Sequence, residues 1–197
     1  MSFNDQLNRI QLKLNQAKKK DFTREVFGAD AHQYESGSPV STEEVIRFEE
    51  HHNIDLPEEY KAFITTLGNG GPGNYGGAGP YYGLYELGDF GYMEPSAKYM
   101  SAPCIINSSL TKKKWKALTA FEEKLDSDSL EYDRKYQLLF SGLMFIGTMG
   151  DSGQMMLILN GIDRGRVVYV NQDLYQPMMK GKFLDWYEEW LDNILQK

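Results

Sequence analysis

The chain has 197 residues, a mass of 22.6 kDa, a net charge of −7 and an isoelectric point near 5.0. Its 41% hydrophobic and 13% aromatic content excludes a mainly disordered protein and predicts one domain with a sizeable core. The negative charge argues against direct binding of nucleic acid, because it repels phosphate backbones, whereas it would attract a basic protein partner.

Membrane insertion and secretion are not predicted. The chain has no run of about 18 apolar residues for a membrane span, and its first residues lack the basic and then apolar order of a signal peptide. The single cysteine, Cys104, cannot form an internal disulfide, which fits a reducing compartment. We therefore expect a cytoplasmic protein.

Residues 1–40 are predicted to form a helical extension and a linker. Apolar residues recur there at helical spacing: Phe3, Leu7, Ile10 and Leu14. Three lysines at 18–20 would face the negative pole of this helix and favour its end. The Ser-Gly-Ser-Pro sequence at 36–39 is typical of a linker. These features predict a boundary near residue 40, with the main domain in 41–197.

Two helices are predicted to open the main domain. Ser41 and Glu44 have the spacing of a capping box, so a helix is expected at about 42–52. Pro57 suits the first position of a second helix, in which four apolar residues form one buried face. They are Tyr60, Phe63, Ile64 and Leu67. A glycine-rich stretch at 68–80 then predicts a mobile loop, because ordering glycine costs conformational entropy.

The second half of the chain predicts most of the sheet. Residues 81–87 are predicted to form a strand, and about 93–140 an insertion with mixed helical signals. Short apolar runs at 143–146, 154–159 and 166–170 predict strands, with a hairpin joining the last two. Residues 183–194 predict a helix that packs through its aromatic face. Its acidic positions, Glu188 among them, are expected to be solvated and to keep ordinary pKa values.

Three motifs suggest chemistry but fit it poorly. The glycines at 68–73 match a dinucleotide fingerprint, yet a helix rather than a strand precedes them. Gly150-Asp-Ser-Gly153 is similar to the nucleophile segment of serine proteases, but no histidine has a matching context, so a tight turn is the better interpretation. The histidines, His32 and the adjacent His51 and His52, do not predict a metal site, and a surface or helix-end role is expected. No cofactor, metal or catalytic residue is predicted.

Several segments of the sequence occur in an order that is shared with one protein family. They are residues 43–50, the Leu-Pro-Glu-Glu-Tyr segment at 56–63, the Leu-Gly-Asn-Gly-Gly exit at 67–71, Phe-Ile-Gly at 145–147 with Gly150 and Gly153, the strand to Gly161, and residues 183–191. Over about residues 41–195 the chain thereby resembles the Smi/Knr-like family of the SUKH superfamily. The resemblance implies an α+β domain, with a central, largely antiparallel sheet flanked by helices.

The resemblance also implies binding of other proteins rather than catalysis. Bacterial domains of this kind look like immunity proteins that neutralise toxins, whereas a fungal relative regulates cell-wall assembly. We therefore predict a non-catalytic immunity-type protein whose partner is a basic toxin domain. The alternatives are a regulatory or scaffold module and an unrecognised hydrolase. The predicted contact surface combines tyrosines near the glycine-rich stretch with nearby carboxylates: Tyr75, Tyr81, Tyr82, Asp89, Glu94 and Asp151.

Overall fold

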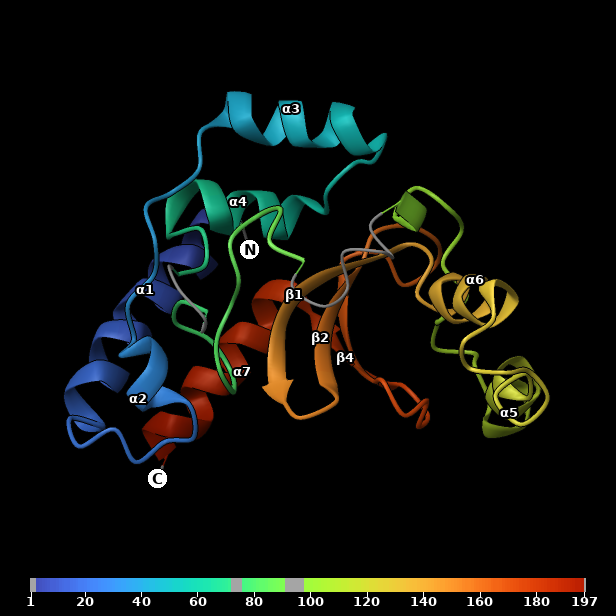
Figure 1. The fold of residues 1–197 in the computed structure, drawn as a ribbon. Helices are drawn as coiled ribbons and strands as arrows, with labels where there is room; N and C mark the ends of the chain where they lie inside the picture. The colour runs from blue at the N-terminus through green and yellow to red at the C-terminus, as the bar shows by residue number, and fades with distance from the viewer. Residues whose placement is uncertain (1–2, 72–75, 91–97, 197) are drawn as a thin grey trace.

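A four-stranded antiparallel sheet forms the centre of the computed structural model, which describes residues 3–71, 76–90 and 98–196 (Figure 1). Its strands lie side by side in chain order: β1 (Leu143–Gly150), β2 (Gly153–Ile158), β3 (Arg166–Asn171) and β4 (Met178–Lys182). Seven helices occur within the described ranges: α1 (Phe3–Lys20), α2 (Ala29–His32), α3 (Thr42–His52), α4 (Glu58–Thr66), α5 (Lys112–Thr119), α6 (Leu130–Leu139) and α7 (Phe183–Gln196). The predicted α+β class, with helices flanking the sheet, is confirmed.

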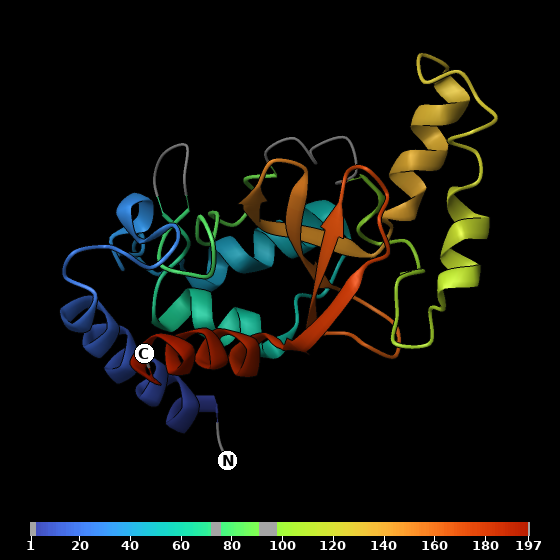
Figure 2. The ribbon, with the colours of Figure 1, turned by 90° about the horizontal axis from the view of Figure 1, so that it is seen from below.

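The sheet has a hydrophobic core on each face, because the side chains of each strand point alternately to the two faces. Met144 and Ile146 belong to a core shared with α1, α4 and α7. Their neighbours on β1, Leu143 and Phe145, belong to a second core that includes residues from α5 and α6. Successive side chains of a strand point to opposite faces, so one short strand serves both cores. Figures 1 and 2 show α5 and α6 on one side of the sheet and α1, α4 and α7 on the other.

The described part of the predicted insertion, residues 98–140, covers the second face of the sheet. Trp115 of α5 and Leu139 of α6 are buried in the second core. The Trp115 indole N–H also donates a hydrogen bond of 2.8 Å to the Leu174 carbonyl. The segment is therefore a structural layer, because without it the apolar side chains of β1, β2 and β3 on this face would be exposed to water.

Helix α1 packs directly against α7. Its buried residues Leu7, Ile10 and Ala17 lie in the same core as Tyr187 and Leu191 of α7. The division near residue 40 stays a prediction about domain organisation, but the first helix is an integral part of the helical layer. None of the helices in the described ranges is both long and apolar enough to cross a membrane.

An ion cluster lies at the contact between α1 and α7, where the sequence predicted a solvated acidic face. The Glu188 carboxylate accepts two hydrogen bonds of 3.0 Å from Arg9, one of 2.9 Å from Lys13 and one of 3.1 Å from Gln6. Burial alone would raise the pKa of Glu188, but the bonds from Arg9 and Lys13 lower it to about 2. The prediction of an ordinary pKa here is wrong, since α1 covers this part of α7.

The glycine-rich stretch is closely packed in its described parts, which makes the prediction of a mobile loop wrong for 68–71 and 76–80. Five glycines bring backbone segments together in what we call the glycine layer: Gly70, Gly71, Gly76, Gly77 and Gly83. A Cβ at Gly77 would lie 2.1 Å from the Gly70 carbonyl oxygen. The Gly77 N–H donates to the Leu84 carbonyl at 2.6 Å, and the Leu84 N–H returns a bond of 2.8 Å.

Residues 81–87 lie along the outer edge of β1 without forming the predicted strand. The N–H groups of Tyr82 and Tyr85 donate to the carbonyls of Thr148 and Ile146 in β1. Tyr81 and Gly83 have φ values of +55° and +89°, however, and this left-handed backbone interrupts an extended ladder. The segment instead forms one isolated bridge, between Gly77 and Leu84.

His32 is the last residue of α2, in keeping with the helix-end role expected for the histidines, but it is buried and not on the surface. Its side chain is 4% exposed, and its Nδ1 accepts a hydrogen bond of 3.0 Å from the Tyr34 N–H. Its Nε2 has no hydrogen-bond partner within the described ranges. Burial, reinforced by the positive charge of Arg24, lowers the pKa of His32 to about 4. The ring is therefore neutral in the folded protein at neutral pH.

We expect this histidine to make folding acid-sensitive. Between pH 6.5 and about 4 the unfolded chain binds a proton that the folded His32 does not, so stability is full above pH 6.5 and falls as the pH decreases. The loss attributable to His32 should be roughly 3 kcal/mol by pH 4. His32→Asn keeps an acceptor for the Tyr34 N–H, and urea denaturation from pH 7 to 4 should show a flatter pH profile than in the wild type. If the stability of the variant and of the wild type fell in parallel as the pH decreased, His32 would not be the source of the acid sensitivity.

Candidate partner-binding site

A concave aromatic surface lies where α7, the sheet and two loops meet. It encloses a cavity of about 340 Å³, which we call the aromatic pocket. Five aromatic side chains line it: Phe27, Tyr81, Tyr169, Trp186 and Trp190. Phe27 is 59% exposed, although it lies in ring contact with Tyr81 and Tyr82. An exposed phenylalanine at the edge of such a pocket is available for contact with another molecule.

The fold holds the walls of the aromatic pocket in place. Trp186 of α7 donates an indole hydrogen bond of 2.8 Å to the Tyr169 hydroxyl on β3. The Tyr81 and Tyr169 rings meet edge to face, with 5.6 Å between their centroids. Tyr81 lies between Gly77 and Gly83 of the glycine layer. The buried Tyr187 hydroxyl of α7 donates to the carbonyl of Ala78, next to Gly77, at 2.8 Å and so holds this segment against α7. Elements distant in sequence thus form a single, preorganised surface.

Two charged side chains give the aromatic pocket a polar rim. The Lys180 ammonium lies 4.9 Å from the centroid of the Tyr169 ring, within the range of a cation–π contact. Glu189 lies exposed on α7 at the other charged position of the lining. Burial raises the pKa of Tyr169 to about 12, so its hydroxyl remains protonated at neutral pH. An aromatic centre with a polar rim is the usual anatomy of a protein interface.

The structure brings three of the six predicted contact residues into one region. Tyr81 lines the aromatic pocket, and Tyr82 contacts Phe27 with 5.2 Å between ring centroids. The Tyr82 ring also covers Gly150, which begins the turn containing the exposed Asp151. Asp89 lies apart from this region, next to Phe90, which packs against Phe48 and His52 of α3. The other two predicted residues, Tyr75 and Glu94, fall outside the described ranges.

Sequence reasoning missed most of the lining of the aromatic pocket. The aromatic stripe of the last helix was assigned to the core, and this is correct for the buried Trp186 but incomplete for the half-buried Trp190. Phe27 belongs to none of the predicted elements. The one signal in the sequence is the adjacent apolar pair Val26 and Phe27, which lies outside any helical or strand periodicity.

The segment similar to a protease motif forms a hydrogen-bonded turn. The Ser152 hydroxyl donates to Asp173 at 2.8 Å and accepts from the Asn171 amide at 2.8 Å. All three histidines lie in other parts of the molecule, within or next to α2 and α3. Among the residues that the structure describes, no group of three or more His, Cys, Asp or Glu side chains is placed to hold a metal ion.

Comparison with known proteins identifies the family. The model of the SMI1 / KNR4 family (SUKH-1) matches residues 39–192, which is well over half of the chain. A search of curated proteins found no match, and a search of solved structures found none either. The family match confirms the resemblance seen in the order of the sequence segments. The chain therefore belongs to the SMI1 / KNR4 family (SUKH-1).

Proposed function

We propose that this chain is a non-catalytic protein-binding domain of the immunity type, which neutralises a toxin by covering its active site or another essential surface. The aromatic pocket and the neighbouring β1–β2 turn form the contact surface in this proposal. Membership of the SMI1 / KNR4 family supports a protein-binding role. We place the protein in the cytoplasm, where a toxin that has entered the cell would meet it.

The single observation that carries the proposal is the aromatic surface next to the aromatic pocket, formed by the exposed Phe27 and the half-buried Tyr81 and Tyr82. Tyrosine and tryptophan are enriched at the centres of protein interfaces, where a few of them dominate the binding energy. These rings are held by ring contacts and by the glycine layer, so binding would cost little conformational entropy.

The charge of the chain favours a basic partner. A net charge of −7 would speed the encounter with a positively charged toxin domain, and carboxylates such as Asp151 and Glu189 at the edge of the surface can imitate substrate phosphates. The Ser152 hydroxyl bonds to Asp173 and Asn171 and not to a histidine, which argues against a serine-protease mechanism and supports a role without turnover. Turnover of a substrate by the purified protein, abolished by one substitution in a pocket, would contradict the proposal.

Co-expression with the product of the adjacent gene tests the proposal directly. If that gene encodes the toxin, this chain should relieve growth arrest and form a stable equimolar complex with it. A complex that forms without relief of toxicity would instead favour the regulatory or scaffold alternative. If no neighbouring candidate toxin forms a complex with this chain and none has its toxicity relieved by it, the immunity proposal is refuted.

Phe27→Ala combined with Tyr81→Ala should weaken the complex with the toxin about 100-fold, because two central aromatic anchors are lost. Surface plasmon resonance measures this change. Ile162→Ala is the matched control, since Ile162 is also exposed but lies in the turn at the opposite end of β2 from Asp151. Its affinity should stay within about twofold of the wild type. Equal losses in both variants would show that the aromatic surface is not the contact.

A further inference from the structure

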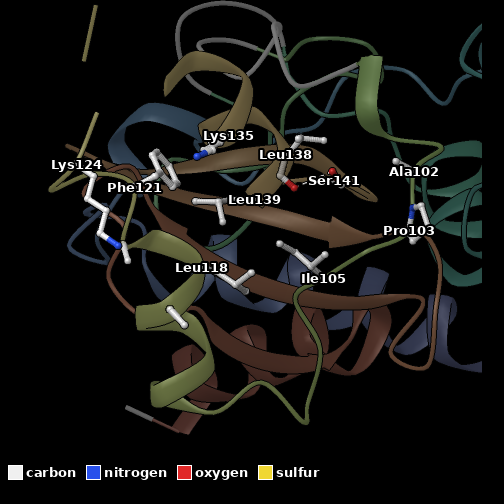
Figure 3. Close-up of a pocket in the computed structure, with 12 residues that line it drawn as sticks. Ala102, Pro103, Ile105, Leu118, Phe121, Lys124, Lys135, Leu138, Leu139 and Ser141 are labelled. Carbon is white, nitrogen blue, oxygen red and sulfur yellow. Dashed lines mark hydrogen bonds between the residues drawn. The ribbon is translucent and has the colours of Figure 1, made fainter. Parts of the chain in front are cut away.

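A second concave surface lies on the opposite side of the sheet and is almost entirely apolar. Its cavity, between α5, α6 and residues 102–105, has a volume of about 680 Å³. Figure 3 shows Leu118 of α5, Leu139 of α6 and Ile105 around the hollow. A neighbouring hollow of about 400 Å³ shares Ile105, Ala117 and Leu118 with it. We call the two together the α5–α6 groove.

Apolar side chains in the α5–α6 groove are accessible to solvent. Leu118 is 41% exposed and Leu138 is 36% exposed, although both face a hollow rather than projecting from the surface. The adjoining Phe121 and Leu139 are buried and continue the apolar lining into the second core. A recessed patch of this kind marks a site that binds an apolar ridge of another molecule.

Lysines lie at separate positions along the α5–α6 groove. Figure 3 shows Lys124 and Lys135 beside Phe121 at one end. Lys114 lines the neighbouring hollow. Within the described part of the chain, Lys135 is the one of these three with an ion pair, to Glu131 at 2.9 Å. Residues 98–141 carry eight lysines and arginines against six aspartates and glutamates, whereas the whole chain has a net charge of −7. The groove is thus a basic region on an acidic protein.

The position of the lysines on α5 is unfavourable for the helix itself. Lys112, Lys113 and Lys114 occupy its first turn, and this turn contains no acidic residue. Cations at a helix N-terminus face the positive end of the dipole, which destabilises the helix. All three side chains are exposed. An arrangement that weakens the helix is consistent with positive charge being required for something outside the molecule.

The walls of the α5–α6 groove favour a helix over a strand as the bound element. Strand addition needs free backbone groups at an edge, but the Ala102 carbonyl and the Cys104 N–H of the extended wall are already engaged. Asn160 accepts from the Cys104 N–H at 2.8 Å and donates to the Ala102 carbonyl at 2.9 Å, and Pro103 between them has no N–H. The rest of the lining consists of helical side chains, which receive the apolar face of an amphipathic helix.

We propose that the α5–α6 groove binds an acidic amphipathic helix of a partner protein. Apolar residues of that helix, spaced i, i+3 or i+4 and i+7, fill the hollow, and its flanking carboxylates pair with the rim lysines. Lysines at separate positions along the groove require several carboxylates, whereas a fatty acid offers only one. The recessed floor excludes a flat bilayer surface. This second surface is independent of the aromatic pocket.

A synthetic peptide tests the proposal. It would have about 18 residues, with leucines along one helical face and glutamates elsewhere, and a fluorescent label for anisotropy. Two matched peptides serve as controls: one has the same composition with its leucines scattered, and the other has lysines in place of glutamates. The first peptide should bind the full chain about tenfold more tightly than either control, and its affinity should fall with salt. Equal binding of all three peptides overturns the proposal.

Variants locate the binding. Leu118→Asp with Leu138→Asp should weaken the acidic peptide at least about tenfold. Leu130→Asp makes the same change on α6 at a leucine that is 88% exposed and outside the groove lining, and it should bind like the wild type. Lys114→Gln with Lys124→Gln, which leaves the apolar lining intact, should reduce affinity and its salt dependence. The proposal is overturned if both double variants bind the acidic peptide as tightly as the wild type does. It is also overturned if the protein sediments with anionic phospholipid vesicles but does not bind the peptide.

Discussion

Replacing Gly77 with alanine should lower the free energy of unfolding by about 3 kcal/mol, at the upper end of the range for overpacking. The added methyl would lie 2.1 Å from the Gly70 carbonyl oxygen, a backbone atom that no side-chain rotation can move away. The glycine layer and its paired bonds between Gly77 and Leu84 would have to separate. Chemical denaturation monitored by circular dichroism measures the loss.

Gly161→Ala separates this packing effect from the general cost of replacing a glycine. Gly161 has a φ of +79°, and a Cβ there would meet no atom within 4 Å. Its replacement should cost only about 1 kcal/mol, from the left-handed backbone alone. Gly77 has no such φ, so its cost comes from contact with neighbouring backbone. Similar losses at the two positions would mean that the glycine layer has room to adjust.

Glu188→Gln should lower the free energy of unfolding by about 2 kcal/mol, between the values for exposed and fully buried ion pairs. The substitution keeps the size of the side chain but leaves Arg9 and Lys13 without a charged partner on Glu188. Glu189→Gln makes the same change one residue later on the exposed face of α7, and it should cost less than about 0.5 kcal/mol. Indistinguishable stabilities of the two variants would refute a structural role for the cluster.

The Glu188 contribution also has a defined pH window. Its pKa is about 2 in the folded protein against 4.5 for a free glutamate, so its stabilisation is present above pH 4.5. That contribution disappears as the pH falls from 4.5 towards 2, because both states then bind the proton. The difference in stability between the wild type and Glu188→Gln should shrink over this window. This window overlaps that of His32 only between about pH 4 and 4.5, so the two groups can be distinguished by measurements above pH 4.5 and below pH 4.

Local signals in the sequence were enough to predict much of the helical and strand structure. The capping box at Ser41 and Glu44 forms as predicted, and the α3 helix ends at His52. The glycine turns between the apolar runs correctly predicted the tight turn between β1 and β2 and the hairpin of β2 and β3. The strand β4 was missed because Met178–Lys182 has little apolar alternation and no β-branched residue. Its strand conformation depends on pairing with β3.

Features that depend on long-range packing could not be predicted. Glu188 looks like an ordinary surface glutamate until α1 is placed over it, and the glycine layer looks like a flexible loop until its neighbours are known. The candidate site follows the same pattern. Tyr81 and Tyr82 were predicted because they adjoin a glycine-rich stretch, whereas Phe27 and Trp190 join them only through the tertiary fold.

The pairing of α1 with α7 constrains how the protein can fold as it is synthesised. Gln6 and Glu188 are hydrogen-bonded but 182 residues apart in the sequence. Helix α1 is synthesised well before α7, and its apolar face cannot be covered by α7 until that helix has also emerged from the ribosome. Closure of a contact this distant is slow. Leu7 and Ile10 therefore remain liable to aggregation while the residues between α1 and α7 are being synthesised, and a chaperone that covers α1 during this interval would protect the chain.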